Sequence, residues 1–357
     1  RSLRFNSDDT AYLSRTPSSA GNRKTWTWSG WVKFCSTSTG NHVFGGGSSC
    51  FNDRTAIFFP SAKINTDLCG IGAYETTDAF FRDFNGWYHF VWAFDTTQAT
   101  ASNRIRFYVN GVEETSFSNA SYPNQDTQVY WNVGGTYYPR IGRRHAAGDY
   151  FDGCMSHVAH IDGTQELPTI FGSTDSTTGE WKINTSPSFT LGTNGFTILK
   201  DGNTITDQSS NSNDFTLASG TLTKTEDNPS NVFATFNPLF IGNGQASTLT
   251  KGNTQGESPT SQGIGGTSTL AASSGKFYAE FLYVSDTSGS NNEGAIGVCD
   301  TYFINSNSNL GGSSSPGYQE YSGGFDFAGG LTTLVVEVGG RDINLSIGPL
   351  FDDVSIR

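Results

Sequence analysis

Apolar and polar residues alternate in short runs along the first 165 residues, and clusters of Gly, Asn, Asp, Ser and Thr separate these runs. Alternation with a period of two places every second side chain on one face of a strand, whereas the intervening clusters are typical of turns. Residues 26–34 and 88–94 carry aromatic side chains at alternate positions. Gly30 interrupts the first of these runs, so we expect a β-bulge there that turns Trp31 toward the core.

A tight hairpin is expected at Asn110-Gly111, which lies between the alternating runs 105–109 and 112–115. An Asn-Gly pair favours the type I′ turn, because both central residues of that turn have positive φ. Residues 140–143 and 150–163 then predict a short strand and a longer closing strand. Together these runs predict an all-β fold built on an antiparallel β-sandwich.

The rest of the chain divides into two regions. Residues 166–262 combine scattered prolines with Ser, Thr, Asn and Gly and hold only brief apolar runs. We expect an extended connector that lies along a neighbouring domain or subunit, since a freely flexible linker has fewer aromatic residues. Alternation returns in residues 263–357 and predicts a second β-sandwich, complete or partial. Its expected strands are residues 275–284, 295–299, 334–338, 343–347 and 351–356, with a surface loop at 305–324.

Composition supports this fold class and excludes several kinds of partner. Aromatic residues make up 13% of the chain, so large buried rings supply a core although only 35% of residues are apolar. The 21 Lys and Arg residues against 33 Asp and Glu give a net charge of −12, without a basic cluster that would neutralise nucleic-acid phosphates. No apolar run reaches the ~18 to 20 residues of a membrane-spanning helix. The sequence begins at Arg1 without an initiator Met or a signal-like run, so we expect a piece of a longer gene product.

The cysteines, the glycine clusters and the histidines each have a structural interpretation. The 5 cysteines fall in no zinc-binding spacing, and they are interpreted as small buried apolar residues. A bridge among Cys35, Cys50 and Cys69 is the alternative in an oxidising compartment. Residues 45–47 are all Gly but lack the Lys-Ser/Thr of a phosphate loop, which predicts a turn or loop tip. His89 lies in an aromatic run and is interpreted as a packed or hydrogen-bonded residue.

Short motifs follow one another in a recognisable order at residues 2–5, 12–13, 26–32, 87–89, 107–111, 141–142 and 151–153. Their order resembles a laminin-G-like domain, a jelly roll of the concanavalin A type, over residues 1–165. More narrowly, residues 25–31, 195–196 and 207–215 resemble the large virion proteins of marine tailed phages, above all those of cyanobacterial hosts. Residues 275–298 are similar to the start of a SPRY-like sandwich, and residues 348–355 resemble the last strand of a galactose-binding-type jelly roll.

The resemblance implies a non-catalytic protein of the virion surface: a tail fibre, a knob or a capsid decoration with lectin-like domains that contact host glycans. The implied partners are other virion proteins, further copies of the same chain and a host cell-surface glycan. The implied location is the outer surface of the virion. A secreted glycan-binding module of a bacterial adhesin is the alternative, and a glycoside hydrolase is a third possibility because laminarinase-type hydrolases share the jelly roll.

The acidic residues do not show the pattern of a hydrolase. A retaining glycosidase needs two carboxylates about 5 to 5.5 Å apart. The closest acidic pairs, Glu113-Glu114 and Asp352-Asp353, are adjacent in sequence and would point to opposite faces of a strand. His157 and His160 also face opposite sides of a strand, and no Gly-x-Ser-x-Gly elbow is present. We therefore expect no catalytic residues and no enzymatic activity.

Two sets of residues are candidates for binding. Sugar binding needs an aromatic ring beside polar groups, and weak alternation indicates loops at the expected glycan-binding residues Trp131, Tyr137, Tyr138 and Arg140. Packing against a neighbouring subunit accounts for these residues equally well. The laminin-G-like resemblance further implies a calcium ion at the rim of the sandwich, with Asp149 and Asp152 as its ligands or, as a second possibility, Asp53 with Asn52. Turn formation is the alternative role of these residues.

Overall fold

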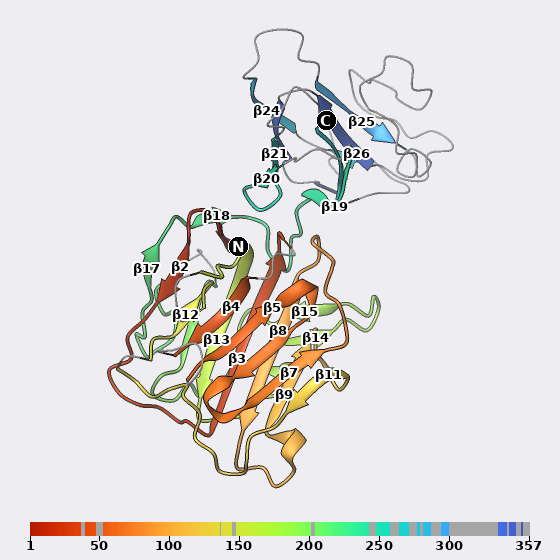
Figure 1. The fold of residues 1–357 in the computed structure, drawn as a ribbon. Helices are drawn as coiled ribbons and strands as arrows, with labels where there is room; N and C mark the ends of the chain where they lie inside the picture. The colour runs from red at the N-terminus through yellow and green to blue at the C-terminus, as the bar shows by residue number, and fades with distance from the viewer. Residues whose placement is uncertain are drawn as a thin grey trace. The chain divides into compact units, whose positions relative to one another are not determined.

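A computed structural model gives two compact units, Arg1–Val232 and Phe233–Arg357 (Figure 1). The structure describes residues 1–36, 40–47, 53–135, 137–144, 148–200, 204–242, 248–257, 264–270, 277–278, 281–286, 294–299, 335–340, 343–347 and 351–352. The division at residue 232 differs from the boundaries at 165 and 262 that the composition predicts.

The first unit is an antiparallel β-sandwich of two sheets, as the alternation predicts. Among the described residues, the first sheet has the order β10 (Val112–Glu113), β9 (Ile105–Val109), β8 (Tyr88–Asp95), β3 (Thr25–Phe34), β13 (Gly153–Asp162), β1 (Ser2–Phe5), β18 (Thr223–Thr225), with β16 (Phe196–Ile198) also paired to β13. The second sheet has the order β11 (Phe117–Ser121), β7 (Ala73–Thr77), β6 (Asn65–Leu68), β5 (Thr55–Phe59), β4 (Asn41–Gly46), β12 (Arg140–Ile141), β2 (Tyr12–Ser14), β17 (Thr216–Ser219). Short 3₁₀ turns lie at η1 (Pro60–Ala62), η2 (Cys69–Ile71), η3 (Ala101–Asn103) and η4 (Pro168–Ile170).

Aromatic side chains fill the space between the two sheets. Trp26 meets Trp92 edge-on and stacks on Phe94, with ring centroids 4.9 Å apart in both pairs. Phe90 of the same strand also belongs to this core. The alternation predicted for residues 88–94 is therefore confirmed, and such ring pairs stabilise the core beyond their buried area.

The hairpin at Asn110-Gly111 is confirmed as well. Asn110 has a φ of 49° and Gly111 a φ of 81°, and Val109 pairs directly with Val112 across the turn. Positive φ at both central residues is the property for which the Asn-Gly pair is favoured. The predicted short and closing strands are present as β12 and β13.

The bulge expected at Gly30 is wrong, because β3 pairs with β8 without a register shift. Gly30 instead makes room for a neighbouring ring: a Cβ there would lie 2.6 Å from Cη2 of Trp28. Without a slip, Trp31 faces the outer side of the first sheet, opposite to Trp28. The irregularity lies in β13, where the pairing with β3 shifts around His157, whose φ is 47°.

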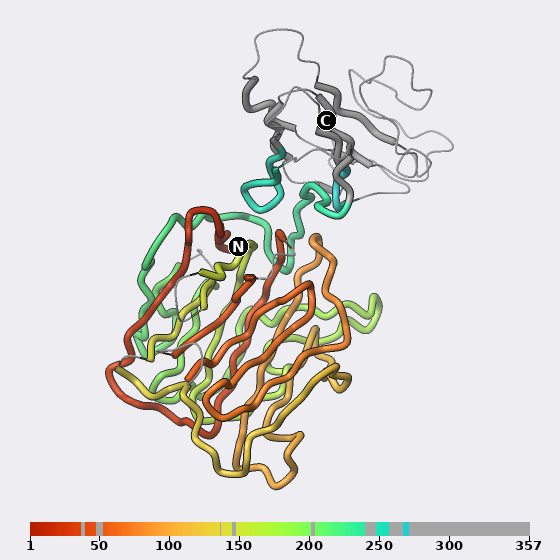
Figure 2. The backbone as a smooth tube through the Cα atoms, viewed as in Figure 1, coloured from red at the N-terminus to blue at the C-terminus, as the bar shows by residue number. Residues whose placement is uncertain are grey.

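Most of the expected connector is part of the first sandwich. β16 pairs with β13, β17 with β2 and β18 with β1, so this segment adds strands to both sheets (Figure 2). Before these strands in the chain, Phe171 and the hairpin of β14 (Gly172–Thr174) and β15 (Trp181–Ile183) cover the outer face of the first sheet. That face carries apolar side chains such as Trp31 and Ile161, and the hairpin shields them from water. The surface along which we expected the connector to lie is therefore the first sheet of the same chain.

We call residues 166–232 the covering segment. A buried ion pair near its end binds it to β3. Nζ of Lys33 on β3 lies 2.7 Å from Oδ2 of Asp227, and their side chains are 1% and 7% exposed. Nε1 of Trp87 donates to Oδ1 of the same carboxylate at 2.9 Å, and the Ser2 hydroxyl donates to the backbone oxygen of Asp227 at 2.5 Å. These contacts explain why the first unit extends to Val232.

The second unit contains two antiparallel sheets. In the segments described for this unit, one sheet has the order β19 (Phe236–Gly242), β22 (Ile264–Ser268), β26 (Val335–Gly340), β25 (Gly294–Cys299), and the other has the order β20 (Thr248–Thr250), β21 (Gln255–Glu257), β27 (Ile343–Ile347), β24 (Phe281–Asp286). β23 (Phe277–Tyr278) pairs with β28 (Phe351–Asp352). The loop predicted at 305–324 lies outside the described residues, and the SPRY-like and galactose-binding-like similarities stay predictions.

Two of the three described cysteine side chains are buried, as the sequence predicts. Cys35 and Cys154 are buried thiols that lie within hydrogen-bonding distance of each other, whereas Cys69 is half-buried. Cys50 and the side chain of Cys299 lie outside the described part of the chain. The structure also has, within its described residues, no helix with the length and apolar character needed to cross a membrane.

Candidate functional site

Trp131, expected as a sugar-stacking residue, is a core residue. Its side chain is 3% exposed, its ring centroid lies 4.5 Å from that of Phe44, and its Nε1 donates to Nε2 of His160 at 3.1 Å. Gly46 makes this position possible, since a Cβ there would lie 2.6 Å from the Trp131 ring. The expectation is wrong for this residue because the glycine run at residues 45–47, which ends β4, opens space for the indole instead of forming a loop tip.

Tyr137 takes part in a separate stack. Its ring lies 6.1 Å from that of Tyr130 with an interplanar angle of 22°, and the guanidinium of Arg23 lies 6.0 Å from the Tyr130 ring. Tyr130 and Tyr137 are half-buried. The structure therefore does not unite the four expected glycan-binding residues in one site.

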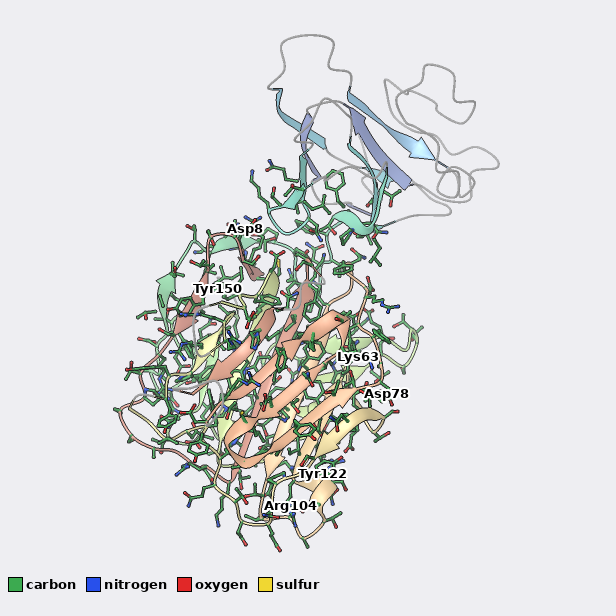
Figure 3. The ribbon with its side chains drawn as sticks, in the orientation of Figure 1. Asp8, Lys63, Asp78, Arg104, Tyr122 and Tyr150 are labelled. Atoms are coloured by element: carbon green, nitrogen blue, oxygen red, sulfur yellow. The ribbon has the colours of Figure 1, made fainter. Side chains whose placement is uncertain are left out.

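Tyr138 and Arg140 do come together with residues that the sequence did not single out. The guanidinium of Arg143 lies 4.5 Å from the ring centroid of Tyr12 and 5.3 Å from that of Tyr150, and the guanidinium of Arg140 lies 5.5 Å from the Tyr138 ring. All five side chains are half-buried. We call these residues, Tyr12, Tyr138, Arg140, Arg143 and Tyr150, the Tyr–Arg patch; Tyr150 is labelled in Figure 3.

Strand pairing in the second sheet places the patch. β12 lies between β2 and β4, so Arg140 is directly opposite Ser14 on one side and Gly45 on the other. Tyr12 and Ser14 point outward from β2, while Leu13 between them is buried. Because Gly45 has no side chain, the long side chain of Arg140 extends over β4, and its Nη1 donates to the Gly47 backbone oxygen at 3.4 Å.

The two arginines of the patch influence each other. Burial lowers the pKa of Arg140, and the nearby positive charge of Arg143 lowers it further, while the hydroxyls of Tyr12 and Tyr138 act in the opposite direction. In the part of the chain that the structure describes, no carboxylate forms an ion pair with Arg140. The patch is therefore a local positive surface on a protein of net charge −12.

Asp149 and Asp152, the expected calcium ligands, both lie beside the turn at Gly40-Asn41. Oδ2 of Asp149 forms an ion pair with Arg144 at 2.8 Å. Burial raises the pKa of Asp152 to about 6, and the neighbouring Asp8 raises it as well. The described residues contain no group of three or more His, Cys, Asp or Glu side chains placed to hold a metal ion. Calcium binding at Asp149 and Asp152 stays a prediction.

His89 is hydrogen-bonded and buried, which confirms its structural interpretation. Nε1 of Trp181 donates to His89 Nδ1 at 3.1 Å. An indole nitrogen only donates, so Nδ1 has no proton and the proton on Nε2 is donated to the Ser29 hydroxyl at 2.9 Å. Burial lowers the pKa of His89 to about 3, which keeps the ring neutral. A general base needs an unprotonated nitrogen facing the hydroxyl, and this pair has the opposite arrangement.

Glu113 and Glu75 both have structural partners. Glu113 forms an ion pair with Arg106. Burial raises the pKa of Glu75 to about 8, and the Thr66 hydroxyl donates to its Oε2 at 3.3 Å. Glu75 lies on the buried face of β7 together with Ala73 and Thr77. This alternation is the signal that could have identified Glu75 as a buried acid from the sequence. Asp353 and the side chain of Asp352 lie outside the described residues.

The fold and the family comparison agree. Residues 6–170 match the sequence model of the concanavalin A-like lectin/glucanase superfamily, of the laminin G type. These residues form a concanavalin A-like lectin/glucanase domain. The laminin-G-like resemblance over residues 1–165 is thus confirmed, and all five residues of the Tyr–Arg patch belong to the concanavalin A-like domain. The comparison does not extend to a phage origin.

Solved structures with similar parts have low sequence identity to the chain. A candidate carbohydrate-binding protein from Bacteroides ovatus is 14% identical with a TM-score of 0.42, over 63% of this chain and 60% of its own length. A heptameric SAP-like pentraxin from Limulus polyphemus is 14% identical with a TM-score of 0.37, over 57% of this chain and 96% of its own. Domains LG4–5 of the mouse laminin α1 chain are 12% identical with a TM-score of 0.36, over 84% of this chain and 60% of their own. The search of curated proteins gave no match.

Proposed function

We propose that the concanavalin A-like domain is a non-catalytic carbohydrate-binding domain and that the Tyr–Arg patch contacts the sugar. The observation that carries the proposal is the grouping of three half-buried tyrosine rings with two guanidinium groups on one surface. Aromatic rings offer an apolar face to the C–H groups of a sugar, and arginine N–H groups donate to its oxygens. The family to which residues 6–170 belong includes lectins, which agrees with this role.

The absence of catalysis is part of the same proposal. Glu113 is neutralised by Arg106, and the Ser29–His89 pair is arranged with the histidine as the donor. Neither arrangement supplies the pair of carboxylates that glycoside hydrolysis uses. A hydrolase function would predict release of reducing ends from a polysaccharide that the protein binds.

Tyrosine substitutions test the binding surface. We expect Tyr138→Ala and Tyr12→Ala each to weaken binding to a recognised polysaccharide by about tenfold, or about 1.4 kcal/mol. Tyr74→Ala is the matched control, because Tyr74 is an exposed tyrosine on β7 of the same sheet. Affinity electrophoresis or calorimetry with the full chain measures the change. Equal effects of all three substitutions would show that the patch is not the binding surface.

The wider proposal is that this domain stands on the outer surface of a virion, as part of a fibre, knob or capsid decoration with other virion proteins and copies of itself. Its support is the resemblance of residues 195–196 and 207–215 to the large virion proteins of marine tailed phages. These residues hold β16 in place: Asp207 Oδ1 accepts from the Thr197 backbone at 2.9 Å, and the Asn213 side chain donates to the Gly195 oxygen at 2.7 Å. Detection of the chain in purified phage particles, with surface labelling by antibody, tests this role. Its recovery only as a secreted cell-associated protein would favour the bacterial adhesin.

A further inference from the structure

We propose that the Tyr–Arg patch selects an anionic sugar, whose carboxylate or sulfate group is held by Arg140 and Arg143 while a sugar ring lies on Tyr138 or Tyr12. This inference rests on the proposed carbohydrate-binding function and adds the class of ligand. It is carried by the hydrogen bonding and charge around Arg140.

Arg140 makes few side-chain hydrogen bonds for a half-buried arginine. Its one side-chain hydrogen bond in the described structure is the 3.4 Å contact of Nη1 with the Gly47 oxygen. Arg104, another arginine with restricted access to water, donates at 2.8, 2.8 and 2.9 Å to the backbone oxygens of Gln98, Pro123 and Ala99. A guanidinium has five N–H donors, so Arg140 retains donors for a ligand.

Arg140 also forms no ion pair with a carboxylate among the described residues. Arg54, Arg106 and Arg144 in the same domain each form an ion pair with a carboxylate, of Asp67, Glu113 and Asp149 respectively. Arg140 instead lies near the like charge of Arg143. A half-buried guanidinium without a carboxylate partner is open to an anion, and the carboxylate or sulfate group of a sugar supplies one.

The rings favour a sugar over a simple inorganic anion. Arg143 lies over two tyrosine rings and Arg140 over a third, and a guanidinium stacked on a ring keeps the donors at its edge available. A free anion uses only the charges, whereas a uronic acid or a sulfated sugar uses the charges and an apolar ring face. The overall charge of −12 repels polyanions from the rest of the surface, so attraction is local to the patch.

The experiment compares two pairs of polymers that differ only in charge. Calorimetry with the full chain uses polygalacturonate against its methyl-esterified form, and dextran sulfate against dextran. We expect one charged polymer to bind at least about tenfold more tightly than its neutral partner, and the pair that responds identifies a carboxylate or a sulfate. Raising the salt from about 50 to about 200 mM is expected to weaken that binding.

Substitutions localise the effect. Arg140→Gln is expected to remove the preference for the charged polymer, and Arg140→Lys to restore part of it. Arg82→Gln is the matched control, since Arg82 is an exposed arginine whose guanidinium lies 4.2 Å from the Phe80 ring and the change in net charge is the same. Thermal unfolding of each variant establishes that it is folded.

Each outcome has a defined meaning. Equal affinity for charged and neutral polymers overturns the anionic specificity and leaves the proposed carbohydrate binding in place. Equal losses in Arg140→Gln and Arg82→Gln overturn the assignment to the patch. Binding of the charged polymer that is matched by inorganic sulfate at the same site overturns the role of the sugar ring. Failure of all four polymers to bind overturns both this inference and the proposed function.

Discussion

Asp227 is the residue whose loss should reveal how the covering segment is held. Its carboxylate accepts from Lys33 Nζ at 2.7 Å and from Trp87 Nε1 at 2.9 Å, in a site where both charged side chains are almost fully buried. The substitution Asp227→Ala removes both interactions and leaves the Lys33 ammonium buried without its carboxylate. We therefore expect a large loss of stability in the first unit.

The magnitude follows from the burial of the pair. Removing one partner of a buried ion pair costs about 3 to 5 kcal/mol, a large part of the 5 to 15 kcal/mol that typically stabilises a domain. The neighbouring Glu226→Ala is the matched control, because the Arg1–Glu226 pair has side chains 56% and 59% exposed. An exposed pair of this kind contributes about 0 to 1 kcal/mol.

Urea unfolding followed by tryptophan fluorescence measures both variants. We also expect the double variant Lys33→Met with Asp227→Leu to recover most of the stability, since apolar residues of similar size often replace a buried ion pair without loss. A cost below about 1 kcal/mol for Asp227→Ala, equal to that of Glu226→Ala, would refute the account of residues 166–232 as part of the first unit.

Two further predictions concern buried titratable groups. Burial raises the pKa of Glu75 from 4.5 to about 8, so stability is complete below about pH 4.5 and is lost as the pH rises through about 8, by an amount on the order of 3 to 5 kcal/mol. Glu75→Gln should remove this part of the pH dependence in urea unfolding at pH 5 and pH 8, and identical profiles for the two proteins would contradict it. The hydrogen bond with Cys154 and burial raise the pKa of the Cys35 thiol, so iodoacetamide at pH 8 should modify Cys69 before Cys35 and Cys154, which should react only after unfolding. Peptide mass spectrometry measures the order, and early modification of Cys35 would contradict the burial.

The strands and turns whose conformation depends on residues close together in the sequence were predictable. In β8 the aromatic residues at alternate positions mark the face that lies between the sheets, because the large rings are all on that side. Asn110-Gly111 fixes its own turn through backbone conformation. Trp31 was not predictable in the same way, because both faces of the first sheet are buried and alternation then loses its meaning. Only the later segment, with Trp181, explains why an outward tryptophan is covered.

The candidate site was predictable only in part. Tyr138 and Arg140 are adjacent in a polar, aromatic stretch, so composition alone singles them out. Tyr12 and Arg143 join them through the pairing of β12 with β2 and through the bridge between Arg143 and Tyr150, which bring distant positions together. Trp131 has the same local composition as Tyr138, and what distinguishes it is the space left by Gly46, on another strand.

A crystal structure of the full chain with an oligogalacturonate or its sulfated counterpart tests the central claim most directly. Our account predicts an intact oligosaccharide on the Tyr–Arg patch, with a ring against Tyr138 or Tyr12 and an anionic oxygen within hydrogen-bonding distance of the Arg140 guanidinium. A cleaved oligosaccharide, or one bound to another face of the domain while the patch holds only solvent, would contradict it.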